Sequence, residues 1–191
     1  AGHYAYLVSE FDGLRVIDVS NPGYPEEVGA YELSGLNEGV AVSGDYLFIA
    51  NGTAGLAVLD VSNPAQPQLR GTYDTGAFAY DVAVSGDPSA GPGQAYAYVA
   101  NGHQGLVVVD LSDPANPQRV GGTDTPGYAE GVAVASDSQG TYAYVATGQQ
   151  GLVVVDLSDP TNPQPLRTFD APGHARGVTA FGFPWARSGQ A

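Results

Sequence analysis

The chain has 191 residues, 43% of them hydrophobic, which is enough to bury a core and make a single domain. Twenty acidic residues face six basic ones, and the formal net charge of −14 repels phosphate backbones, so we expect no nucleic-acid partner. The absence of cysteine excludes disulfides and cysteine-ligated metals. No apolar run approaches the roughly 20 residues that a membrane helix needs, so we expect no membrane insertion.

Short runs with strand character follow one another along the whole chain. The first covers residues 4–8, and the first complete set covers residues 40–43, 46–50, 55–61 and 69–73. Each run is rich in Val, Ile, Leu or Tyr and is bounded by Gly, Asn, Asp or Pro, which is typical of antiparallel strands joined by tight turns. No window has a helical periodicity free of Gly and Pro. The sequence therefore predicts an all-β fold.

One phrase, Gly-Leu-x-Val-x-Asp-x-Ser-x-Pro, occurs four times. Its starting glycines are Gly13, Gly55, Gly105 and Gly151, which lie 42, 50 and 46 residues apart. Self-similarity at this period is the mark of a repeat architecture. A repeated four-stranded antiparallel unit of about 40–45 residues is a β-propeller blade. We assign residues 40–43 to the innermost strand of such a blade and residues 69–73 to the outermost.

The tyrosine-rich runs predict how neighbouring blades pack. In residues 95–100 and 142–146 the tyrosines share one face of the strand, and alanines fill the other face. Large side chains of one sheet then lie over small ones of the next, which brings facing sheets to interior packing density. These aromatic side chains are interpreted as core.

The ends of the chain predict how the propeller closes. The chain starts on a second strand at residues 4–8 and ends on an innermost strand at residues 177–181, so the last strand is expected to complete the first blade. This gives a four-bladed ring without a free edge, as a single domain over residues 1–182 with a tail or linker at 183–191. The alternative is that the four repeats form part of a larger propeller.

The repeats resemble the LVIVD repeats of exported and cell-surface β-propeller proteins. The segments at residues 105–117 and 125–134 are close to the consensus of that family, and the resemblance covers roughly residues 4–182. The resemblance implies a propeller fold and an extracellular or cell-surface location. Separately, the absence of methionine at position 1 fits a processed product or an excerpt of a longer chain. The resemblance implies no single activity, because propellers host many functions.

An aspartate ends the third strand of every repeat, two residues before a serine. A short carboxylate at this place accepts backbone N–H bonds and builds the following turn. The alternative is a set of calcium ligands, since carboxylates suit a hard cation. The spacing lacks an Asp-rich binding loop, so we interpret these residues as structural, with no metal or cofactor expected. They are Asp18, Asp60, Asp110 and Asp156.

Polar residues gather on the turns that precede the innermost strands. All of these turns fall at one end of the propeller, where a rim around a central opening can hold a ligand. Glu38, Asp81, Glu130 and Arg176 are read as equivalent positions that differ between repeats. The candidate rim also includes Tyr80, Tyr128, His103 and His174.

Three functions remain open from these residues. We expect a non-enzymatic scaffold, adhesion or structural protein of the cell surface. Its partners are expected to be other proteins or further copies of itself, and copies that repeat the same head-to-tail contact would form filaments. A carbohydrate-active hydrolase using Glu38 and Glu130 is one alternative. A module that binds a sugar or small ligand at the rim is another. Asn51 begins the one Asn-Gly-Thr sequon and is a glycosylation candidate, although Asn-Gly is also a turn signal.

Overall fold

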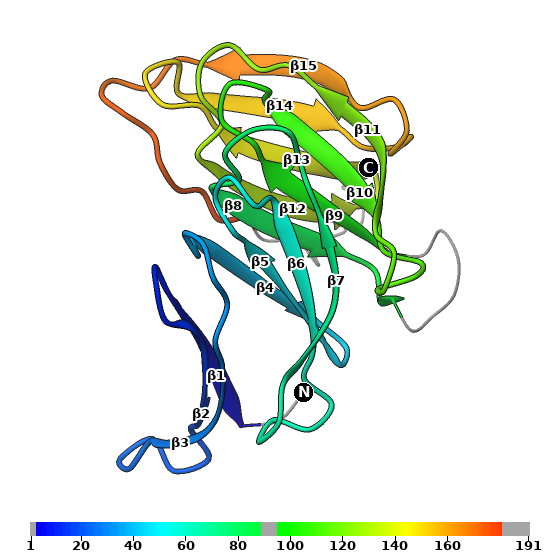
Figure 1. Cartoon of the computed structure of the whole chain (residues 1–191). Helices are drawn as coiled ribbons and strands as arrows, with labels where there is room; N and C mark the ends of the chain where they lie inside the picture. Colours follow the sequence, from blue (N-terminus) through cyan, green and yellow to red (C-terminus); the bar gives the residue numbers. More distant parts are fainter. Residues whose placement is uncertain (1–2, 89–94, 181–191) are drawn as a thin grey trace, which may run out of the picture.

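The computed structural model describes residues 3–88 and 95–180 and confirms the all-β prediction. Four antiparallel sheets, which we call blades 1 to 4, follow one another in chain order (Figure 1). The predicted tail at 183–191 lies outside the described residues, as do Phe181 and part of the long turn at 86–94.

Blades 2 to 4 have four strands each, and blade 1 has three. Blade 1 contains β1 (Tyr4–Ser9), β2 (Gly13–Asp18) and β3 (Glu26–Tyr31). Blade 2 contains β4 (Gly39–Ser43), β5 (Tyr46–Ala50), β6 (Leu56–Asp60) and β7 (Gln68–Tyr73). Blade 3 contains β8 (Asp81–Ser85), β9 (Tyr96–Ala100), β10 (Leu106–Asp110) and β11 (Gln118–Thr123). Blade 4 contains β12 (Gly131–Asp137), β13 (Gly140–Ala146), β14 (Leu152–Asp156) and β15 (Gln164–Phe169).

The core lies between blades, with large side chains of one sheet against small ones of the next, as the sequence predicts. Phe48 of β5 packs in one cluster with Ala97 of β9. Tyr98 of β9 packs in the next cluster with Ala143 of β13. Both aromatic rings are buried, and at about 25 cal/mol per Å² of apolar surface they are large contributors to the stability of each seam.

The outer strands approach the following blade through a glycine. A Cβ at Gly29, Gly71 or Gly121 would lie 2.1, 2.6 or 2.3 Å from the carbonyl oxygen of a proline in the next blade. These prolines, in the same order, are Pro64, Pro114 and Pro160, and each ends the repeated phrase of its blade. The phrase therefore builds its own blade and also supplies a contact surface to the blade before it.

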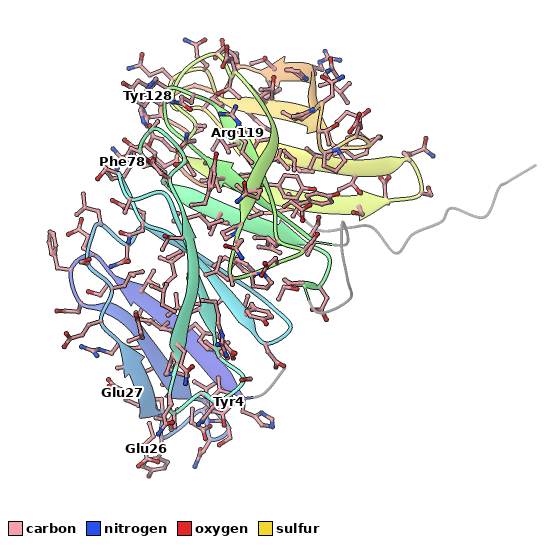
Figure 2. All side chains as sticks on the ribbon, turned by 45° about the vertical axis from the view of Figure 1, so that its right-hand side comes forward. Tyr4, Glu26, Glu27, Phe78, Arg119 and Tyr128 are labelled. Carbon is pink, nitrogen blue, oxygen red and sulfur yellow. The ribbon has the colours of Figure 1, made fainter. Side chains whose placement is uncertain are left out.

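Among residues 3–88 and 95–180 the blades do not close into a ring, so the expectation of a four-bladed ring is wrong for this structure. β1 pairs only with β2, and residues 177–180 form no strand. Blades 1 and 4 lie at opposite ends of the molecule in both overall views (Figures 1 and 2). The terminal segment therefore has no second strand within reach, and pairing in a β-ladder requires one. The four blades form an open arc, which agrees with the alternative of a larger propeller.

Candidate functional site

The repeated aspartates bind their own turns. Oδ1 of each accepts the backbone N–H of the serine two residues later, at 2.7 to 2.9 Å. This is the contact that a turn-building role requires. The Ser62 hydroxyl and then the Arg70 guanidinium lower the pKa of Asp60 to about 2. Among the described residues, no three His, Asp or Glu side chains form a group that would hold a metal ion.

Backbone hydrogen bonds place one residue of each repeat at the same point of the rim. Gly52 pairs with Ala79, Gly102 with Ala129 and Gly148 with Ala175 across neighbouring blades. The residue that follows each paired alanine, or the equivalent Asn37, occupies the same position in its repeat, and in blades 2 to 4 it lies just before the innermost strand. These following residues are Glu38, Tyr80, Glu130 and Arg176.

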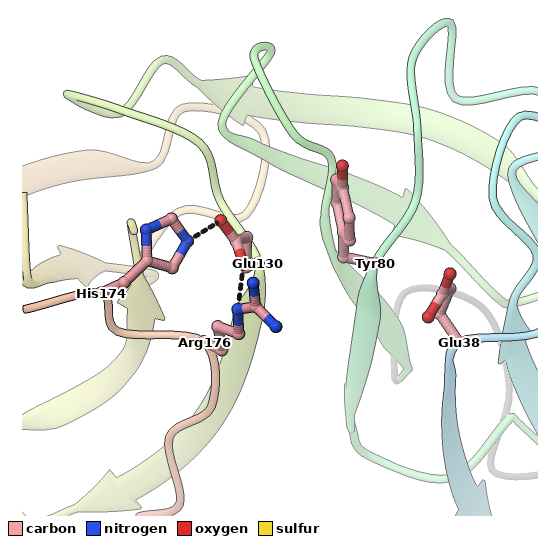
Figure 3. Close-up of a pocket in the computed structure, with 5 residues that line it drawn as sticks. All are labelled: Glu38, Tyr80, Glu130, His174 and Arg176. Carbon is pink, nitrogen blue, oxygen red and sulfur yellow. Dashed lines mark hydrogen bonds and ion pairs between the residues drawn. The ribbon is translucent and has the colours of Figure 1, made fainter. Parts of the chain in front are cut away.

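Four of the predicted rim residues, together with His174, line one cavity. Glu38, Tyr80, Glu130, His174 and Arg176 surround a polar hollow of about 480 Å³ (Figure 3). Blades 2, 3 and 4 thus contribute Glu38, Tyr80 and Glu130, each just before the innermost strand of its blade, and the segment after blade 4 contributes His174 and Arg176. Burial, followed by the neighbouring Glu130, raises the pKa of the Tyr80 hydroxyl, which keeps it a neutral hydrogen-bonding group.

Two side chains contact Glu130 inside this cavity. His174 Nε2 lies 2.6 Å from Oε1 of Glu130, and Arg176 Nε lies 3.6 Å from Oε2 (Figure 3). The side chain of Arg176 is 80% exposed, so it still faces the solvent in the hollow. Glu38 lies across Tyr80 and forms no ion pair with another described residue. The cavity therefore offers one free carboxylate, one phenol and one exposed guanidinium.

Asp81 does not belong to the ring of equivalent positions, which corrects the sequence reading. Asp81 pairs with Ala100 in blade 3, as Gly39 pairs with Ala50 in blade 2. Asp81 is therefore the equivalent of Gly39, the residue after Glu38, and not of Glu38 itself. The Asp81 carboxylate accepts the N–H of Val82 at 2.9 Å and the N–H of Val132 in the next blade at 3.0 Å. Burial raises the pKa of Asp81, and the two backbone hydrogen bonds oppose that change. Asp81 therefore ties β8 to β12.

The remaining rim candidates lie beside the cavity. The rings of His103 and Tyr128 meet edge to face, with centroids 6.4 Å apart. Tyr128 also lines a neighbouring hollow of about 290 Å³ that shares Glu130 and His174 with the main cavity. The structure thus gathers His103 and Tyr128 at the outer margin of the same rim.

Asn51 is unsuited to carry a glycan in the folded chain. Its side chain is buried, and Nδ2, the atom that would be glycosylated, donates to the carbonyl oxygen of Ser34 at 2.9 Å. The equivalent Asn101 is also buried and donates to Thr75 at 2.9 Å. The Asn-Gly pair is therefore a structural corner, and the glycosylation candidate is corrected on this ground.

The fold and the rim define a repeat protein of the β-propeller type, with its variable residues on one face. The LVIVD repeat model matches residues 1–32, 34–75, 77–125 and 126–170. The chain belongs to the LVIVD repeat family. This match confirms the family resemblance. The part of the chain that the structure describes contains no helix long and apolar enough to cross a membrane.

Known structures support the fold alone. The chain resembles the crystal structure of the computationally designed Ika8 protein, with a TM-score of 0.67 and 9% identity. The alignment covers 93% of this chain and 49% of the designed one, so the arc spans about half the length of that protein. No curated protein matches the sequence.

Proposed function

We propose that this chain is a non-enzymatic scaffold or adhesion module that works at the cell surface or in extracellular material. The supporting observation is that both oxygens of Glu130 already face side chains of its own chain, His174 and Arg176. A glycosidase needs two carboxyl groups, one protonated and one free. Both oxygens of Glu130 are thus engaged by side chains of the same chain, which leaves neither of them free to contact a glycosidic oxygen.

An activity assay distinguishes the scaffold function from the hydrolase alternative. We expect the purified chain to release no product from a panel of polysaccharides and aryl glycosides. The variants Glu38→Gln and Glu130→Gln are then expected to behave as the parent does. Turnover above the blank that is lost in both variants but kept in Glu10→Gln, a change outside the cavity, would overturn the proposal.

The location is part of the proposal and rests on the family resemblance. An antibody against the chain is expected to label intact source cells or their surrounding material. Labelling that appears only after the cells are made permeable would place the protein inside and remove the surface role.

Ligand binding at the rim is a second candidate, favoured by the composition of the cavity. A carboxylate, a phenol and an exposed guanidinium, here Glu38, Tyr80 and Arg176, match the hydroxyl groups and the ring of a sugar. Removal of one such group costs roughly 1–3 kcal/mol of binding.

Glycan arrays followed by calorimetry test this candidate. For any glycan that binds, we expect Tyr80→Ala to weaken binding at least about tenfold. Tyr24→Ala is the matched control, because Tyr24 is exposed on a different surface. Equal binding by the Tyr80 and Tyr24 variants would place the glycan elsewhere.

A further inference from the structure

Four rings gather near the seam between blades 3 and 4, beside the glycine corner at Gly102. A Cβ built on Gly102 would lie 3.3 Å from Cε2 of Tyr80 and 3.7 Å from Cδ1 of Tyr128. The absence of a side chain at this corner thus lets rings from two blades approach one point. The ring centroids of Phe78 and Tyr80 are 4.5 Å apart, and those of His103 and Tyr128 are 6.4 Å apart. We call these four ring-bearing residues the ring patch.

Backbone alternation turns the ring patch toward the solvent. Phe78 and Tyr80 flank Ala79, which is fully buried and paired in a β-bridge. Because alternate residues of an extended segment point to opposite faces, the two rings share the outward face of the rim. The same alternation exposes Tyr128, 55% of which is accessible. Phe78 and Tyr128 lie on the same side of the arc (Figure 2), so the outer part of the ring patch is open to a ligand.

Tyr80 joins the ring patch to the polar cavity described above. Its ring lies between Glu130 and Glu38 in that cavity (Figure 3), and it also contacts the ring of Phe78. The smaller hollow of about 290 Å³, which Tyr128 lines, shares Glu130 with the main cavity. The polar cavity and the ring patch are therefore neighbouring parts of one surface, and a ligand longer than the cavity would continue onto the rings.

We propose that the ring patch is a second subsite for a neutral linear glycan whose first sugar lies in the polar cavity. This inference rests on the rim-binding candidate above and names its ligand class. In the cavity, Glu38 accepts hydrogen bonds from sugar hydroxyls, and the Tyr80 phenol donates or accepts them. On the patch, the next sugar lies against Tyr128, because the C–H face of a sugar ring is apolar and packs on an aromatic side chain.

Two observations favour a neutral glycan over a peptide or an acidic polymer. The backbone beneath the patch is already paired, since Gly102 N–H donates to Ala129 at 3.1 Å and Ala129 N–H donates to Gly102 at 2.9 Å. A peptide therefore finds no strand edge to join at this corner. The formal net charge of −14 repels an acidic polymer. A neutral glycan needs neither free backbone groups nor opposite charge, and it uses the rings and polar groups that are present.

The dependence of affinity on glycan length is the first test. Calorimetric titration uses cellohexaose, chitohexaose and xylohexaose, each beside its monosaccharide. We expect at least one hexasaccharide to bind at least about tenfold more tightly than its monosaccharide, which fills only one subsite. Failure of all three hexasaccharides to bind, or equal affinity for a hexasaccharide and its monosaccharide, would overturn the inference. Binding of hexagalacturonate or hexalysine in place of the neutral glycans would overturn it too, because the ligand would then be a charged polymer.

Variants of Tyr128 locate the second subsite. We expect Tyr128→Ala to weaken hexasaccharide binding at least about fivefold, and Tyr128→Phe, which keeps the ring, to bind as the parent does. Tyr128 is 55% exposed, so both variants are expected to fold, and circular dichroism checks this. Tyr24→Ala is the matched control on a different surface. Equal binding by the Tyr128→Ala and Tyr24→Ala variants would refute the second subsite.

Tyr80→Ala, titrated with the same hexasaccharide, separates this inference from the proposals on which it rests. If Tyr80→Ala weakens binding and Tyr128→Ala does not, the inference fails and the rim-binding candidate stands. If only Tyr128→Ala weakens binding, the cavity is not a sugar site, and the rim-binding candidate fails together with the two-subsite arrangement. Release of shorter products from the hexasaccharide would overturn the non-enzymatic function but leave the second subsite in place.

Discussion

Replacing Gly105 with alanine is expected to lower the free energy of unfolding by about 4 kcal/mol. Gly105 has a φ of +70°, which costs an alanine roughly 1–2 kcal/mol. Its Cβ would also lie within 2.4 Å of the Thr123 carbonyl oxygen and 2.6 Å of the Thr125 nitrogen. Both contacts are with backbone atoms, one at the end of the outer strand β11 and one in the turn that follows it, and Thr123 cannot move away without breaking the ladder of blade 3. Urea unfolding followed by far-ultraviolet circular dichroism measures the loss.

Gly173→Ala separates the two causes of this loss. Gly173 also has a positive φ, of +105°, but no atom lies within 4 Å of a Cβ built on it. We expect this variant to lose only about 1–2 kcal/mol. If the free energy of unfolding falls by the same amount in both variants, the close approach of Gly105 to the outer strand is not the reason that this position requires glycine. Gly13, Gly55 and Gly151 have the same φ sign and the same backbone contacts, which explains why every phrase begins with glycine.

The parts of the fold that depend on one repeat could be predicted from the sequence. The phrase from Gly105 to Asp110 forms the third strand because its turn residues and its alternation are local signals. The alternation of tyrosine and alanine also predicted which face packs against which neighbour, and Tyr98 against Ala143 shows it. These features need only the pattern within one blade and the presence of a second.

Closure of the ring could not be predicted in this way. Whether residues 177–180 reach β1 depends on the angle between successive blades, summed over the whole arc. That angle follows from the packing of side chains such as Phe48 and Tyr98 at each seam. No local pattern encodes it, so counting strands predicted a closed ring where the structure has an open arc.

The candidate site was predicted in position but not in detail. Repeat alignment located the rim, yet it took Asp81 as the equivalent of Glu38, because an aspartate stands where the other repeats have glycine. Strand register resolves this shift by one residue. The contacts of Glu130 with His174 and Arg176 were not foreseen, since these residues are more than 40 positions apart. The available signal was that all of them precede innermost strands.

Replacing Gly71 with alanine is expected to destabilise the seam between blades 2 and 3 by about 3 kcal/mol. Unlike Gly105, Gly71 has no positive φ, so the backbone conformation itself accepts alanine. The added Cβ would lie 2.6 Å from the carbonyl oxygen of Pro114 and 2.8 Å from that of Ala115. The sheets therefore have to separate, which also loosens the apolar contacts beneath. Thermal unfolding measures the loss, and amide exchange in β7 and in the loop after β10 locates it.

Gly23→Ala is the matched control, because its Cβ would meet only the side chain of Asn21, at an ordinary 3.5 Å. This variant is expected to stay within about 0.5 kcal/mol of the parent. Blade 4 has a larger residue at the position of Gly71. Arg167 stands at the Gly71 position in blade 4, the one described blade that no further blade follows. A tolerated Gly71→Ala change would mean that the glycine is not needed for blade contact.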